Sequence, residues 1–260
     1  MVPRARESRA STCPTGRRRC RDASRTASLS GRGEPNVKVT RILVIDVGGS
    51  HVKALVMGRR VPVKIPAGPA MTAKDMVRRV RKATAGWSFD AVSIGFPGPV
   101  VHGKPVAEPK NLGPGWVGFN FTRAFGRPVK IINDAAMQAL GSYRGGRMLF
   151  LGLGTGLGSA LIVDGVLEPM ELAHLPYRKG RTYEEYIGDA ARKRLGKKKW
   201  RRHVIDVVMR FKAAFQADDV VVGGGNAKKL DGRLPGVRLG SNAHAFLGGY
   251  RLWTRRTRRG

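Results

Sequence analysis

The sequence is short of cysteine and of long apolar runs, and each shortage excludes a class of protein. Its two cysteines, Cys13 and Cys20, lie in an odd N-terminal segment. The part expected to fold therefore has no disulfide framework and no Cys/His zinc cluster. No apolar run approaches the ~20 residues that a membrane-spanning helix needs. We expect a soluble protein with no membrane partner, in a reducing compartment, the cytoplasm.

Acidic residues are also scarce. The chain has 18 Asp and Glu against 49 Lys and Arg, a formal net charge of +31. Both ends are rich in arginine, yet a large positive excess remains on the segment between them. Such a field favours a polyanionic partner, namely nucleic acid, an acidic surface or a polymeric phosphate. A general bias toward basic residues would explain the same charge.

The first 36 residues consist mainly of Arg, Ser, Thr, Pro and Gly, with almost no large apolar side chains. Such a segment cannot bury enough surface to offset the entropy of ordering, so we predict disorder over 1–36 and a basic tail over 254–260. The leading segment resembles a transit peptide in its acid-poor composition. A misassigned start is an equally good explanation.

A glycine turn follows the first apolar segment. Residues 42–45 predict a buried strand, Asp46-Val47-Gly48-Gly49-Ser50-His51-Val52-Lys53 follows, and the apolar residues 52–57 predict an antiparallel return strand. A strand that ends in an acid beside free amides suits a phosphate and its Mg²⁺. Asp46 would hold the ion, usually through water, and Ser50 with the turn amides would hold phosphate oxygens. An ordinary hairpin with a surface aspartate is the alternative.

The same pattern recurs over residues 148–163, where Leu153-Gly154-Thr155-Gly156-Leu157 separates two apolar runs. Two such turns facing each other would hold a phosphate chain between them. The order of strand, turn and strand argues against a dinucleotide-binding fold, in which a helix follows the glycines.

Between the two turns we predict a strand over 61–65, a helix over 72–85 capped by Thr72, and a buried strand over 91–96. Pro97-Gly98-Pro99 follows that last strand, where α/β proteins place ligands. The loop 111–116 brings Asn111 and Trp116, and for the tryptophan we favour packing over a place in a pocket.

A strand over 128–132 ends in Asn133-Asp134, and a helix opens at Ala135. Asp134 at this junction has two interpretations, a helix N-cap or a general base at the carboxyl end of a strand. From these residues alone the cap is favoured. Asn133 beside it would orient a hydroxyl.

The last third contains further polar candidates. Glu171 and His174 are spaced as a metal pair on a helix, but no third ligand follows, so hydroxyl binding with Glu184 fits better. The basic run 197–202 at a helix start is a solvated face or a polyanion track. A strand over 220–222 leads into Gly223-Gly224-Gly225 and a helix, a turn suited to a nucleotide. The closing helix, 243–252, contains Gly248-Gly249 for close packing.

The chain contains, in this order, the segments DVGGSHVK, GFPGPV with NLGPGW, IINDAA, LGLGTGLGSALIVDG with ELAH, and VVVGGGN. Together these five segments resemble the ROK family of sugar kinases over roughly residues 40–253. GFPGPVVHG, SALIVDGVLEPMELAH and KKKW resemble the branch that uses polyphosphate and ATP on glucose. The resemblance implies an α/β, actin-like (ribonuclease-H-like) ATPase fold with two domains around a cleft. The small domain would comprise 37–135 and 244–253, and the large domain 136–243.

The resemblance also implies a reaction, in which Asp134 accepts the proton of the glucose 6-hydroxyl, with Mg²⁺ as cofactor and polyphosphate or ATP as donor. A homodimer is the common state of the family. The remaining implied site residues are Asn133, Glu171, His174, Glu184, Gly98 and Asn111 for the sugar, Asp46, Gly48, Gly49, Ser50, Lys53, Gly154, Thr155 and Gly156 for the phosphates, and Gly224 and Gly225 beside the adenosine.

Two departures limit the resemblance. Many members have a cysteine-rich zinc motif after the histidine, but residues 175–181 contain no cysteine, so we expect no zinc. The first 36 residues lack the helical period of a helix-turn-helix, so we expect no specific DNA binding. The alternatives are a kinase for mannose or another hexose, and a non-enzymatic, nucleic-acid-associated protein on the same fold.

Overall fold

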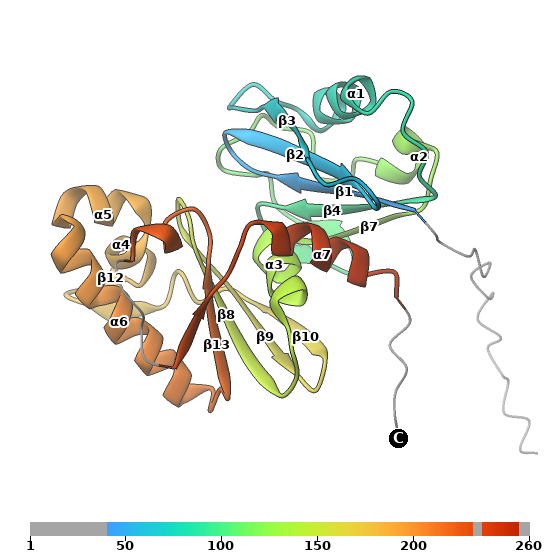
Figure 1. Cartoon of the computed structure of the whole chain (residues 1–260). Helices are drawn as coiled ribbons and strands as arrows, with labels where there is room; N and C mark the ends of the chain where they lie inside the picture. Colours follow the sequence, from blue (N-terminus) through green and yellow to red (C-terminus); the bar gives the residue numbers. More distant parts are fainter. Residues whose placement is uncertain (1–40, 231–235, 255–260) are drawn as a thin grey trace, which may run out of the picture. The chain divides into compact units, whose positions relative to one another are not determined.

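The computed structural model of the chain describes residues 41–230 and 236–254, which belong to one compact unit. The disorder predicted for residues 1–36 and the basic tail from residue 255 onward lie outside the described residues. Two five-stranded sheets form the framework of this unit (Figure 1).

The first sheet has the strand order β3-β2-β1-β4-β7. β1 pairs antiparallel with β2, and β1, β4 and β7 run parallel. The predicted hairpin is therefore confirmed, and the carboxyl ends of the three parallel strands share one edge of the sheet. The bounds are β1 Ile42–Val47, β2 His51–Val56, β3 Val63–Pro66, β4 Ala91–Phe96 and β7 Val129–Asn133.

Helix α1, Ala73–Ala83, and the short helix α2, Phe121–Phe125, cover one face of this sheet and pack on it through apolar side chains. Thr72 caps α1 as predicted, because its hydroxyl accepts a hydrogen bond from the Asp75 amide at 3.1 Å. Trp116 is fully buried in the same core, with its ring 5.6 Å from that of Phe96. Its role is packing, as the sequence favoured.

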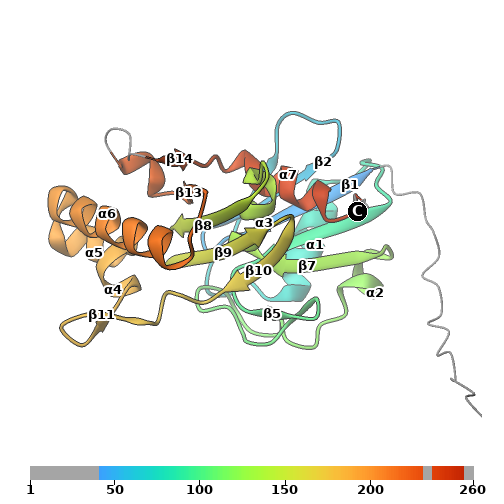
Figure 2. The same ribbon diagram turned by 90° about the horizontal axis from the view of Figure 1, so that it is seen from below.

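The second sheet has the order β10-β9-β8-β13-β14 (Figure 2). β8 and β9 form the predicted second hairpin, and β13 runs parallel to both β8 and β14. The bounds are β8 Arg147–Leu153, β9 Leu157–Val163, β10 Val166–Met170, β13 Asp219–Gly223 and β14 Val237–Leu239. The edge strand β14 was not predicted.

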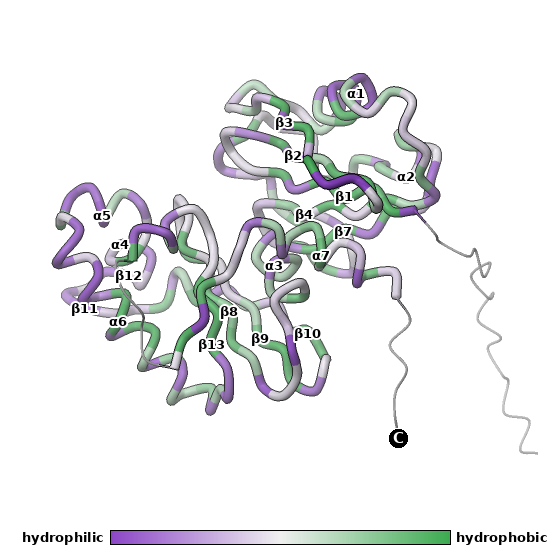
Figure 3. Tube along the Cα trace, in the orientation of Figure 1, coloured by the Kyte–Doolittle hydropathy of each residue, from purple (hydrophilic) through white to green (hydrophobic). Residues whose placement is uncertain are grey.

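Three helices pack on the second sheet, α4 Glu184–Ile187, α5 Asp189–Leu195 and α6 Lys197–Ala214. α6 begins within the basic run, and its indole at Trp200 is fully buried, donating to the Ile187 carbonyl at 2.8 Å. The hydropathy of these elements matches their positions, because strands β8 and β13 are apolar and α5 has strongly polar stretches (Figure 3). The basic run thus lies on a helix that has an apolar inner face.

Helices α3, Asp134–Ser142, and α7, Ala243–Arg251, pack closely on each other. A side chain at Gly248 would overlap the Met137 carbonyl, and one at Gly141 would overlap the His244 carbonyl. Gly249 in turn lies against the side chain of Val44 on β1. The close packing predicted at Gly248-Gly249 is confirmed. α3 also contacts strands of both sheets, among them β4, β8 and β9, so this helix connects the two sheets.

Short elements differ most from the sequence prediction. The glycine turn after β13 leads into a single 3₁₀ turn, η1 Ala227–Lys229, rather than a longer helix. Two small hairpins were not predicted, β5 Val100–Val101 with β6 Lys104–Pro105, and β11 Pro176–Arg178 with β12 Arg181–Thr182. Among the described residues, no helix combines the length and the apolar character that crossing a membrane requires.

Candidate active site

The first glycine turn, residues 48–50, follows Asp46 at the end of β1. Asp46 stands opposite Lys53 in the hairpin register and forms an ion pair with it, Oδ2 to Nζ 3.2 Å. The Gly48 amide is used within the turn, donating to the His51 carbonyl at 3.0 Å. Within the described chain the amides of Gly49 and Ser50 have no hydrogen-bond partner. The turn therefore presents two free donors beside a carboxylate and an ammonium group.

Asn111, predicted to bind the sugar, lies against this first turn. A methyl group on Gly49 would stand 3.0 Å from the Asn111 Cβ. Gly98 lies beside Asn133, because its carbonyl accepts a hydrogen bond from the Asn133 side-chain amide at 3.1 Å. The structure thus brings Asn111 to the first glycine turn and Gly98 to the Asn133-Asp134 junction.

The second glycine turn, residues 154–156, repeats the internal bond of the first. The Gly154 amide donates to the Gly156 carbonyl at 3.0 Å, and the amides of Thr155 and Gly156 have no partner in the part of the chain that the structure describes. Glu184 lies directly against this turn. Its Oε2 accepts from the Leu157 amide at 3.1 Å, and a side chain at Gly156 would overlap the same carboxylate.

Two residues that the sequence reasoning missed hold the second turn from behind. The Asn226 side chain donates to the Gly154 carbonyl at 3.0 Å, and the Asp189 amide donates to the Thr155 carbonyl at 3.2 Å. Gly224, with φ +84°, lets its backbone come so close to Leu153 that a side chain there would overlap it. Only the asparagine directly after the glycine run offered a local signal for this contact.

Asn133, not Asp134, is the N-cap of α3. Its Oδ1 accepts from the Ala135 amide at 2.9 Å and from the Ala136 amide at 3.1 Å. The interpretation of Asp134 as the cap, favoured by the residues alone, is therefore wrong. β7 ends at Asn133 and α3 begins at Asp134, so the helix starts one residue earlier than it would if Asp134 were the cap. Asp134 is the first helical residue, and one of its oxygens accepts from the Ala135 amide at 2.8 Å.

The Asp134 carboxyl is only partly exposed, and its pKa is raised to about 7. Desolvation by the surrounding protein is the main cause, and the negative charge of Asp46 adds to it, followed by that of Glu171. These contributions mean that the charges of Asp46 and Glu171 act on Asp134. A carboxyl that titrates near neutral pH is suited to accept a proton from a substrate.

Glu171 and His174 lie on a turn after β10, not on a helix, so the helical metal pair is wrong. Both side chains are exposed. Among the described residues no three His, Cys, Asp or Glu side chains are grouped as a metal site. The backbone joins this turn to Glu184, whose amide donates to the Ala173 carbonyl at 3.0 Å.

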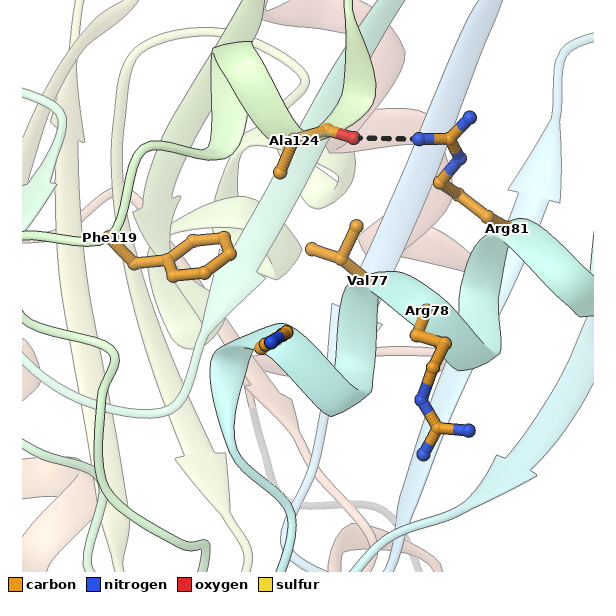
Figure 4. Close-up of a pocket in the computed structure, with 6 residues that line it drawn as sticks. Val77, Arg78, Arg81, Phe119 and Ala124 are labelled. Atoms are coloured by element: carbon orange, nitrogen blue, oxygen red, sulfur yellow. Dashed lines mark hydrogen bonds between the residues drawn. The ribbon is translucent and has the colours of Figure 1, made fainter.

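A pocket of about 350 Å³ lies elsewhere, between α1 and the segment around α2 (Figure 4). The Arg81 guanidinium at its edge donates to the Ala124 carbonyl at 3.1 Å. None of the residues discussed above lines it. The lining residues are Lys74, Val77, Arg78, Arg81, Phe119 and Ala124.

Comparison with known proteins accounts for this arrangement. No protein-family model matches the chain. A polyphosphate glucokinase of Mycobacterium tuberculosis is 31% identical over 216 residues, which cover 74% of this chain and 80% of that protein. The chain belongs to the ROK family of sugar kinases. The predicted family and fold are thereby confirmed.

Solved structures of sugar kinases agree with the fold. The inorganic polyphosphate/ATP-glucomannokinase from Arthrobacter sp. strain KM is 26% identical, with a TM-score of 0.71, covering 82% of this chain and 98% of that one. A ROK family glucokinase from Streptomyces griseus, solved with glucose and AMPPNP, shares the fold with a TM-score of 0.67 at 19% identity, over 82% of this chain and 99% of its own.

Proposed function

We propose that this ROK protein transfers a phosphoryl group from polyphosphate or ATP to the 6-hydroxyl of glucose. The observation that carries the proposal is Asp134, a carboxyl whose pKa of about 7 is raised by burial and by Asp46 at the first glycine turn. Similarity to polyphosphate glucokinase and to a polyphosphate/ATP-glucomannokinase supports both donors.

Asp134 acts as the general base. One of its oxygens is held by the Ala135 amide, which fixes the carboxyl and leaves the other oxygen for the 6-hydroxyl proton. A base of this kind contributes roughly 10²–10⁴-fold in rate. Because phosphoryl transfer depends mostly on positioning and on charge neutralisation, the surrounding amides and cations supply the rest.

The remaining sugar hydroxyls are bound by polar side chains around Asp134. Asn133 uses its oxygen for the helix cap and one amide hydrogen for the Gly98 carbonyl, which leaves one hydrogen for a hydroxyl. Glu171 and His174 are exposed and free to bind hydroxyls. Glu184 connects the segment of Glu171 and His174 to the second turn, so it lies between the proposed sugar site and the proposed donor site.

The phosphate donor is bound by the two turns. The amides of Gly49, Ser50, Thr155 and Gly156, which have no hydrogen-bond partner among the described residues, donate to its oxygens, and Lys53 adds a positive charge. Mg²⁺ binds proteins through one or two carboxylates together with substrate phosphates and water, and Asp46 fits this requirement. When bound, the ion neutralises charge that develops on the transferred group. Gly224 and Gly225 would border the adenosine of ATP.

A phosphorylation screen of hexoses against ATP and polyphosphate tests the proposal. Glucose 6-phosphate should form with at least one donor. Mannose is the second candidate, since the Arthrobacter neighbour is a glucomannokinase. A filter-binding assay with nucleic acid runs beside it. Nucleic-acid binding without phosphorylation of any hexose would replace the kinase with a non-enzymatic, polyanion-binding protein.

Three further points belong to the same proposal. The small domain would comprise residues 37–135 and 244–253, and the large domain residues 136–243, with glucose between them. The protein would act in the cytoplasm. It would form a homodimer, which size-exclusion chromatography with light scattering tests directly.

A further inference from the structure

The segment between His174 and Glu184 is a small hairpin with one irregular residue. Pro176 pairs with Thr182 and Arg178 pairs with Arg181, so β11 has one residue more than β12 at this point. That residue is Tyr177. A β-bulge of this kind turns a side chain away from the regular pleat, and bulges are frequent beside active sites.

Tyr177 contacts helix α6. Its hydroxyl donates to Asp206 Oδ2 at 2.6 Å and lies 3.2 Å from His203 Nδ1. Its ring stacks on that of Tyr183 at 4.9 Å between centroids and meets that of Tyr186 edge-on at 5.0 Å. The hydroxyl thereby attaches the hairpin to α6, and the ring packs on the two tyrosines at α4.

Asp206 is the centre of this group. Besides the Tyr177 hydroxyl, it accepts from Arg210 Nε at 2.8 Å and forms an ion pair with Arg178 at 3.5 Å. Burial, together with the bond to Asp206, raises the pKa of Tyr177 to about 12, so the phenol stays protonated and donates a hydrogen bond to the carboxylate. A hydrogen bond to a charged group is about twice as strong as one between neutral groups.

The open end of the hairpin joins two parts of the proposed site. The Tyr183 amide donates to the Leu175 carbonyl at 3.1 Å, directly after His174, and the Glu184 amide donates to the Ala173 carbonyl. Glu184 is also fixed from the other side by the Leu157 amide. The turn that carries Glu171 and His174 is held at its middle, where the Leu172 amide donates to Ser159 Oγ at 3.3 Å and the Leu172 side chain packs in the core. Its far end, directly after His174, is held by the hairpin.

We propose that Tyr177 and Asp206 are positioning residues for the sugar, because their hydrogen bond fixes the β11–β12 hairpin on α6 and so places Glu171 and His174. This inference rests on the proposed function. Neither residue touches a substrate in this account. Their loss should therefore weaken glucose binding while leaving the donor site nearly intact.

The experiment uses the full chain and four variants. Tyr177→Phe removes only the hydroxyl, Asp206→Asn keeps an oxygen that accepts it, and Asp206→Leu removes the acceptor. Tyr143→Phe is the matched control, since that hydroxyl donates to the Gly146 carbonyl at 3.1 Å away from the hairpin. Glucose affinity is measured by calorimetry without donor, and KM is measured separately for glucose and for the donor. Melting temperatures show which variants are folded.

We expect Tyr177→Phe and Asp206→Leu to raise the glucose Kd and KM roughly five- to tenfold, with the donor KM changed less than about twofold. The glucose Kd and KM of Asp206→Asn should stay within about threefold of the wild-type values, and those of Tyr143→Phe should equal the wild-type values. Unchanged glucose constants in folded Tyr177→Phe, or equal losses for both substrates, would overturn the positioning role alone. A wild-type chain that neither binds nor phosphorylates glucose would overturn the proposed function as well.

Discussion

The two glycine turns have the same backbone pattern but different surroundings. In each, the first glycine amide bonds within the turn and the next two amides have no partner among the described residues. The first turn carries its own acid and base, Asp46 and Lys53, on the two strands of its hairpin. The second receives its polar partners from distant parts of the chain, Glu184 and Asn226.

This difference indicates a division of labour. A carboxylate at a strand end beside free amides suits a metal ion and the phosphoryl group that moves, whereas a turn contacted by Glu184 and Asn226 from distant segments suits a link between the donor and the rest of the site. Glu184, beside the second turn, is also joined through its backbone to the segment of Glu171 and His174, for which we propose sugar binding. We infer that the first turn acts on the reacting group and that the second couples the two substrates.

The comparison assumes that both turns serve one reacting centre at Asp134. Asp134→Asn keeps the size of the side chain but removes the base, so kcat should fall by about 10²–10⁴-fold, while the glucose Kd changes little. Steady-state kinetics and calorimetry measure the two quantities. Turnover near that of wild type would contradict the role of Asp134 and remove the common centre.

The second turn can be broken selectively. In Gly156→Ala the new methyl group would overlap the Glu184 carboxylate, which is itself held by the Leu157 amide. We expect kcat/KM to fall roughly 10- to 100-fold, as for loss of a hydrogen bond to a charged group, with both KM values raised.

Gly68→Ala is the control, since a methyl group there meets no atom within 4 Å among the described residues other than its chain neighbours, and its φ is not positive. It should stay within about threefold of wild type. The double variant Gly156→Ala/Glu184→Gln should lose little more than either single variant, because both act on one contact. Additive losses in the double variant would show that Gly156 does not act through Glu184.

Much of this framework is predictable from the sequence, for physical reasons. β1 and β4 are almost entirely buried, so their residues form short, continuous apolar runs that indicate central strands. The Gly-Gly turn and the Thr72 cap follow from local chemistry that needs no tertiary contact. The repeat of the turn over 148–163 predicted the second hairpin for the same reason.

What could not be predicted depends on contacts between distant residues. Asn133 and Asp134 are both good caps, and only the length of β7 decides between them. Glu184 shares no sequence pattern with the second turn, 27 residues away. The strands β11 and β12 are short and largely polar, so no alternation marks them.

The pH dependence tests the surroundings of the first turn. The pKa of Asp134 in the folded chain, about 7, lies above its ordinary value of 3.8 because of burial and of Asp46. kcat/KM should therefore fall about tenfold per pH unit below pH 7 as the base becomes protonated. Lys53→Gln removes the cation beside Asp46, so it should move this acidic limb to higher pH.

The same shift makes a prediction about stability. Between pH 4 and 7 the folded chain binds more protons at Asp134 than the unfolded chain does, so its contribution to the free energy of unfolding falls as the pH rises through this window. Asp134→Asn removes this contribution. Urea denaturation should show the variant gaining on wild type from pH 5 to pH 8. An equal difference at both values would mean that the pKa is not raised.

The smallest expected effect concerns the support of the second turn. Lys229 Nζ donates to Asn226 Oδ1 at 2.9 Å, and Asn226 in turn donates to the Gly154 carbonyl, so one residue separates this ammonium from the turn proposed to bind the donor. Lys229→Gln should raise the KM for polyphosphate about two- to fivefold at low ionic strength. The effect should shrink in 0.5 M salt, because screening then limits interactions between exposed charges to a few ångströms. Lys228→Gln is the control, since Lys228 is exposed and has no such contact among the described residues. If both variants change the polyphosphate KM equally, polyphosphate binding depends on the overall positive charge of the surface. The contact between Lys229 and Asn226 then has no specific role in binding the donor.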